Sequence, residues 1–180
     1  MNVERAISVR RSIRKFNSRP VGDEVLRKIL LAGNDAPSAL NNQDKAIVAI
    51  VGDKAKAKLN EVVKANSTPE TVERITARLN GEFNFFYNAP VLILVTSSNT
   101  LYPEADCSCA IENMYLRATD LGLGACWINQ LTKVNYPELK EFLKKSGLGE
   151  QYVVYGALAV GYTDETFTTK EKKNRIIVVR

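Results

Sequence analysis

The spacing of hydrophobic and polar residues along the 180-residue chain predicts helices interleaved with short buried strands. The clearest helix covers 104–121, because apolar residues recur there at three- and four-residue steps and Gly122 stands where a C-terminal glycine is expected. Its apolar stripe consists of Cys107, Ala110, Ile111, Met114, Ala118 and Leu121. Similar spacing predicts helices at 2–9, from Gly22 or Asp23 to Gly33, from a cap at Asp53 to Ala65, at 69–79 and at 137–146.

Apolar runs without helical spacing predict five extended segments. They are AIVAIV at 46–51, APVLILVTS at 89–97, the short ACWI at 125–128, YVVYGALAVGY at 152–162 and RIIVV at 175–179. Strands and helices intermix, and no repeat, linker or low-complexity tract interrupts them. One domain over 1–180 is therefore expected, α/β or α+β, built around one central sheet.

Composition and charge are those of an ordinary globular protein. Hydrophobic residues make up 45% and charged residues 25%, and the net charge of +5 is spread along the chain. Such dispersed charge does not favour nucleic-acid binding, although a basic domain that binds nucleic acid or an acidic protein and catalyses nothing stays open. The chain starts with charges where a signal peptide needs apolar residues, and its longest aliphatic run, VLILV, cannot span a bilayer. A cytoplasmic protein without a membrane partner is expected.

The absence of histidine narrows the chemistry that the chain can perform. Ser-His and Cys-His nucleophile systems and histidine-ligated metals are excluded. Cys107, Cys109 and Cys126 are poorly spaced for zinc and are expected to be small core residues, the first two on different sides of their helix. No pair of acids forms a catalytic motif, so any enzymatic chemistry is expected to rest on a bound cofactor, and no metal is predicted.

The segment RRSIRKF at 10–16 concentrates like charge in one short stretch. In an extended segment side chains alternate, so Arg10, Ser12 and Arg14 share a face. Two guanidinium groups beside a hydroxyl suit a phosphate or another planar anion. Taken alone, however, the segment is more typical of a solvated basic loop.

Two further polar stretches are weak signals by themselves. APSALNNQ at 36–43 offers hydroxyl and amide groups that suit the polar edge of a heterocycle, but alone it is more typical of a loop before a strand. LGLGACWINQ at 121–130 has glycines that let the backbone approach a ligand. It follows a helix instead of opening one, so it is no dinucleotide-binding fingerprint, and a helix stop before a core tryptophan explains it equally well.

Together and in this order, the three stretches resemble the motifs of the nitroreductase family of FMN enzymes. The shared elements are R-R-S-I-R, then A-P-S-x-x-N-x-Q, then a helix that ends in G-L-G-x-C-W-I, and the resemblance covers nearly the whole chain. It implies an α+β fold with a central mixed, mostly antiparallel sheet flanked by helices. It also implies a homodimer that binds FMN at its interface, with the C-terminal strand added to the partner's sheet.

The resemblance implies roles for residues at matching positions. Arg10 pairs with the FMN phosphate, Ser12 bonds the pyrimidine side or the ribityl chain, and Arg14 lies near N1 and O2 of the ring. The other cofactor-binding candidates are Arg11 in the basic segment; Pro37, Ser38, Ala39 and Asn41, which approach the flavin from the partner subunit; Trp127, Ile128, Asn129 and Gln130, which offer backbone N–H groups to N5 and O4; and Lys172, Lys173 or Arg175 near the phosphate.

The implied activity is that of an NAD(P)H-dependent flavin oxidoreductase. NADH or NADPH passes hydride to flavin N5, and a small electron-poor acceptor, a nitroaromatic or a quinone, then takes its place in a ping-pong cycle. The cofactor carries the chemistry, so no catalytic side chain is expected beyond electrostatic support from Arg14. Where many members read Q-P-W this chain reads QDK, with Asp44 and Lys45, and Asn129 replaces a glycine or an acid. A flavoprotein of the same fold with another substrate remains an alternative.

Overall fold

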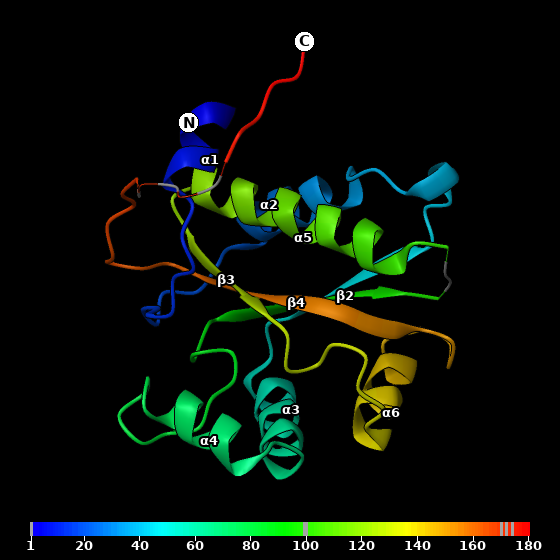
Figure 1. Ribbon diagram of the computed structural model, residues 1–180. Helices are drawn as coiled ribbons and strands as arrows, with labels where there is room; N and C mark the ends of the chain where they lie inside the picture. The colour runs from blue at the N-terminus through cyan, green and yellow to red at the C-terminus, as the bar shows by residue number, and fades with distance from the viewer. Residues whose placement is uncertain (1, 99–100, 170, 172, 174) are drawn as a thin grey trace.

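The computed structural model describes residues 2–98, 101–169, 171, 173 and 175–180 (Figure 1). Its helices are α1 (Val3–Val9), α2 (Asp23–Asn34), α3 (Asp53–Ala65), α4 (Pro69–Thr76), α5 (Pro103–Asp120) and α6 (Pro137–Lys145), with a 3₁₀ turn, η1, at Ala39–Asn41. Its strands are β1 (Lys45–Ile50), β2 (Val91–Ser97), β3 (Gly124–Ile128) and β4 (Val153–Gly161). All the predicted helices and the first four predicted strands are confirmed in position.

The four strands form one antiparallel sheet in the order β1-β2-β4-β3. The pairing of β2 with β4 shifts register between Val95 and Thr96. A single parallel bridge joins Ser12 to Ala125 of β3 at the edge of the sheet. The predicted α+β fold with a mostly antiparallel sheet is therefore confirmed, and its one parallel contact comes from the basic segment.

Helices cover both faces of the sheet, with α1, α2 and α5 on one side and α3, α4 and α6 on the other (Figure 1). Every residue of β2 is buried, as expected for a central strand whose two faces both pack against helices. The predicted stripe of α5 packs on the sheet, and Cys107, Ala110, Ile111, Met114 and Ala118 are fully buried. No helix in the described part of the chain is both long and apolar enough to cross a membrane.

Three predicted helix boundaries are wrong. Gly33 lies inside α2, where a Cβ atom would come 2.7 Å from Met114 Cγ, so this glycine permits close helix packing and does not end the helix. Gly52 occupies the cap of α3, and Asp53 is its first residue and pairs with Lys56 at 3.1 Å. Helix α4 ends at Thr76 and continues only as turns, until Asn80 takes a left-handed conformation.

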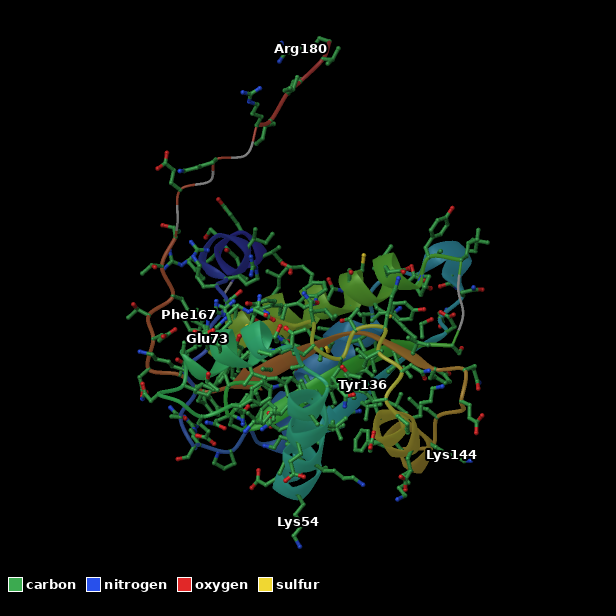
Figure 2. All side chains as sticks on the ribbon, turned by 60° about the horizontal axis from the view of Figure 1, so that its bottom comes forward. Lys54, Glu73, Tyr136, Lys144, Phe167 and Arg180 are labelled. Atoms are coloured by element: carbon green, nitrogen blue, oxygen red, sulfur yellow. The ribbon has the colours of Figure 1, made fainter. Side chains whose placement is uncertain are left out.

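Two other expectations are also corrected. Cys109 is exposed and does not belong to the core, whereas Cys107 and Cys126 are buried. Residues 175–179, predicted as a strand, belong to no strand of this chain: Ile176, Ile177, Val178 and Val179 are exposed, and the tail extends away from the body to Arg180 (Figures 1 and 2). Pairing of this segment with a second copy of the chain stays a prediction.

Candidate functional site

The basic segment is extended and runs along the free edge of β3. The Ile13 N–H donates to the Ala125 carbonyl oxygen at 2.8 Å, and Ser12 forms the parallel bridge to the same residue. Ile13 is buried, while Ser12 and Lys15 are exposed. A Cβ at Gly124 would lie 2.7 Å from Ile13 Cγ2, so that glycine lets the segment approach β3 closely. The shared face of Arg10, Ser12 and Arg14 stays a prediction, because Lys15 is exposed although it lies two residues from the buried Ile13.

Two of the arginines lie over aromatic rings that come from different parts of the fold. The Arg10 guanidinium carbon is 4.7 Å from the centroid of the Tyr115 ring on α5, and Arg10 Nε is 3.4 Å from the Glu112 carboxylate. The Arg14 guanidinium carbon is 5.7 Å from the centroid of the Tyr87 ring. Cation–π contacts of this kind restrict where a guanidinium group can point. Each arginine is thus fixed on its own ring.

Tyr115 holds the basic segment in place, and sequence reasoning missed it. Its hydroxyl donates to the Arg11 carbonyl oxygen at 2.9 Å and lies 3.2 Å from Ser12 Oγ. Burial raises the pKa of this hydroxyl, so it remains a neutral donor at neutral pH. The available signal was a tyrosine beside Met114, within the apolar stripe of α5, since a buried tyrosine usually finds a partner for its hydroxyl.

Several guanidinium N–H groups of the segment are buried without an acceptor. They are Nε and Nη2 of Arg11 and Nε of Arg14, and neither arginine has an ion-pair partner in the described part of the chain. Arg11 Nη1 does donate, to the carbonyl oxygens of Ser8 and Arg10. A buried donor left unpaired costs about 1–3 kcal/mol, and more when charged. This donor set therefore fits an anion, or a second chain, that closes over the segment.

The loop 37–43 is fixed by α5 and by its own side chains. The Ala39 N–H donates to both carboxylate oxygens of Asp106, at 3.0 and 3.1 Å, and Asp106 is almost fully buried. The Gln43 N–H donates to Ser38 Oγ at 3.0 Å. Leu40 takes a left-handed conformation with φ of 52°, and this residue is 85% exposed. Asp106 was not predicted, because a lone acid near a helix start is an ordinary feature.

The predicted residues of this loop differ in exposure. Pro37 and Asn41 are exposed, and Ser38 and Ala39 are partly buried. Asp44 and Lys45, which stand where many family members have Pro and Trp, directly follow the loop. Asp44 accepts a hydrogen bond from Ser97 Oγ at 3.1 Å, and Lys45 Nζ donates to the Ala36 carbonyl oxygen at 2.8 Å. Asp44 and Lys45 thus connect the loop to the strands beside it.

The end of β3 leads into a surface cavity of about 310 Å³. Trp127 packs on the α5 side of the sheet and Ile128 is buried on the other side, so only the backbone of Ile128 is available to a ligand. Asn129 and Gln130 line the cavity. Its remaining lining, Asn66, Ser67, Thr68, Thr71 and Arg74, comes from α4 and the loop before it, which sequence reasoning did not connect with the site.

The C-terminal candidates lie in the tail. Lys173 and Arg175 are exposed, and Lys172 lies outside the described residues. The structure thus places the basic segment and Asn129–Gln130 at β3 and the loop 37–43 against α5. The contribution of the tail stays a prediction.

Comparison with known proteins agrees with this architecture. The nitroreductase family matches residues 7–162. A nitroreductase with bound FMN from Bacteroides fragilis is 34% identical with a TM-score of 0.84, each chain covered over 100% of its length. A second, from Desulfitobacterium hafniense, is 24% identical with a TM-score of 0.83 over 100% of both chains, and shows the same fold.

A curated relative agrees as well. A protein of Archaeoglobus fulgidus, provisionally named an NADH dehydrogenase/NAD(P)H nitroreductase, is 32% identical over 87% of this chain and 82% of its own length. The matched region contains the basic segment, the loop 37–43 and β3. The chain belongs to the nitroreductase family.

Proposed function

We propose that the chain binds FMN and reduces small electron-poor acceptors at the expense of NADH or NADPH. The observation that carries this proposal is the set of buried, acceptor-free N–H groups of Arg11 and Arg14 beside the exposed Ser12. Membership of the nitroreductase family supports it, as do the FMN bound to the Bacteroides fragilis structure and the NAD(P)H in the name of the Archaeoglobus fulgidus relative.

The chain's own residues would bind and orient the cofactor. The Arg10 side chain, at the start of the basic segment, is partly exposed and would meet the phosphate, and Ser12 would bond the ribityl chain or the pyrimidine side. Tyr115 would fix both through the backbone of Arg11. The backbone beyond Ile128 would approach the reactive edge of the ring, because β3 ends there and its N–H groups are no longer used by the sheet.

Bound FMN would accept and pass on hydride, and the positive charge of Arg14 would make the flavin easier to reduce. Arg14 rests on Tyr87 without a carboxylate partner in the described part of the chain, so its positive charge stays available. A cation next to N1 and O2 favours the negative charge that reduction adds, and such a contact is worth about 2–4 kcal/mol by analogy with oxyanion donors. With no histidine in the sequence, no acid–base residue of that type takes part.

The first test concerns the cofactor itself. We expect the purified protein, reconstituted with excess FMN, to bind one FMN per chain and to show a visible band near roughly 450 nm. The measurement is a visible spectrum, followed by chromatography of the released flavin against FMN and FAD. A colourless protein that binds polyanions with steep salt dependence would favour the non-enzymatic alternative instead.

The second test concerns the homodimer. Leu40 is an apolar residue that is 85% exposed on a loop held by Asp106, and this suits insertion of its side chain into a second copy of the chain. We expect light scattering to give twice the chain mass of 20.0 kDa. Leu40→Asp is expected to shift the protein toward the monomer, because a carboxylate buried at an interface is strongly disfavoured.

The matched control is Val51→Asp, which changes an aliphatic residue that is 56% exposed beyond the other end of β1. It should leave the mass unchanged. A monomeric wild-type protein with FMN still bound would contradict the proposed dimer and leave the cofactor proposal standing.

A further inference from the structure

The cavity at the end of β3 contains one cation and no acid among its lining residues. Six of the seven lining residues are neutral and polar, with hydroxyl groups from Ser67, Thr68 and Thr71 and amide groups from Asn66, Asn129 and Gln130. The seventh is Arg74, on the second turn of α4. At about 310 Å³ the cavity has the size of a small-molecule site. Its chemistry is that of a subsite for an anionic group.

Arg74 is the one charged donor that the cavity can offer. It has no ion-pair partner within the described residues. The start of α4 contributes little, because Pro69 lacks an N–H and the Thr71 N–H already donates to Thr68 Oγ1. The nearby acid Glu70 is engaged: the pKa of its carboxyl is lowered by hydrogen bonds from its own backbone and from Thr68. Anion binding here therefore depends on Arg74.

The turns that follow helix α4 connect the cavity with the basic segment. Arg78, four residues after Arg74, donates from Nη1 to the Tyr87 hydroxyl at 3.3 Å. The Tyr87 ring in turn lies under Arg14. At the other wall, Asn129 and Gln130 belong both to the cavity and to the backbone that is proposed to face the reactive edge of the flavin. The cavity is thus placed where the molecule that exchanges hydride would extend beyond the ring.

We infer that Arg74 and this cavity form a subsite for the anionic group of the molecule that reacts at the flavin. The inference rests on the proposed function. A guanidinium group binds carboxylate and phosphate oxygens in a bidentate manner, and the surrounding amides and hydroxyls satisfy the remaining lone pairs. The group is a carboxylate on the acceptor or the 2′-phosphate that distinguishes NADPH from NADH, and the experiment separates these two sources.

The experiment compares ligands that differ in one charge. Steady-state kcat/KM is measured for 4-nitrobenzoate and nitrobenzene as acceptors, and flavin reduction by NADPH and by NADH is followed in separate half-reactions. Binding of benzoate and benzamide to the FMN-loaded protein is measured by calorimetry, which needs no turnover. The variants are Arg74→Gln and Arg74→Lys. The control is Lys140→Gln on α6, an exposed cation at the other end of this helical layer (Figure 1).

Arg74→Gln is expected to lower kcat/KM for 4-nitrobenzoate about tenfold and nitrobenzene less than about twofold, with a parallel loss of benzoate binding. Arg74→Lys should recover part of the loss, and Lys140→Gln should change nothing. A loss with NADPH but not NADH, and none with 4-nitrobenzoate, would support the subsite and assign it to the dinucleotide.

Three results would overturn the inference: equal losses for charged and neutral ligands, no loss for any charged ligand, or a loss of FMN affinity in Arg74→Gln, which would assign Arg74 to the cofactor. A wild-type protein that binds no FMN would defeat the proposed function itself. That outcome is recognised before any variant is compared.

Discussion

Replacing Arg10 by alanine is expected to weaken FMN binding by about tenfold or more. The loss of a charged hydrogen-bonding partner costs about 1.5–3 kcal/mol. The substitution also leaves Glu112, now 3.4 Å from Arg10 Nε, without its cation, and its carboxylate would then repel the phosphate. The measurement is a titration of the FMN-free protein by quenching of flavin fluorescence. With saturating FMN, turnover should largely recover, because Arg10 is assigned to binding.

Arg14→Ala is expected to act differently from Arg10→Ala. Its proposed position near N1 and O2 predicts a flavin that is harder to reduce even when the site is full, seen as a more negative reduction midpoint. Lys15→Ala is the matched control, since Lys15 is an exposed cation of the same segment. Small, equal effects of all three substitutions, within about 0.5 kcal/mol, would mean that the segment is solvated surface charge.

Most of the fold could be predicted because its local signals agree with its tertiary packing. The stripe of α5 is regular, and β2 is apolar throughout because both faces are covered. The C-terminal segment shows the limit of this reasoning. RIIVV has strong strand propensity, yet propensity does not supply a partner, and in this chain those residues pair with no strand.

The residues of the candidate site could be predicted from the sequence where they are adjacent to one another, and could not be predicted where they are far apart in the chain. The basic segment and the end of β3 could be found from runs of unusual composition. Tyr115, Asp106 and Arg74 could not, because each is an ordinary residue for its helix and gains its role only through a distant partner. Asp106 lies 67 residues from Ala39, and Tyr115 lies 104 residues from Arg11. Contacts at such separation are set by the topology of the sheet.

The substitution Gly33→Leu is expected to lower the free energy of unfolding by about 1–3 kcal/mol, the usual cost of overpacking a dense core. A Cβ at this position would lie 2.7 Å from Met114 Cγ and 2.9 Å from Ile47 Cδ1, and Met114 is fully buried and cannot move into solvent. Better helix propensity returns up to about 1 kcal/mol, so the steric term dominates. Urea unfolding at one fixed FMN concentration measures the change.

A double-mutant cycle separates the close contact of α2 with α5 from other effects of the larger side chain. Met114→Ala alone leaves a cavity and is expected to cost about 2–5 kcal/mol. Combined with Gly33→Leu it frees the space that the leucine needs, so the pair should be less destabilised than the sum by about 0.5–3 kcal/mol. Leu31→Ala, an exposed position on the same helix, should stay within about 0.5 kcal/mol. Strict additivity would contradict direct packing between these helices. Because α5 carries Tyr115 and Asp106, coupling should also appear in FMN affinity, through the segments that those two side chains hold.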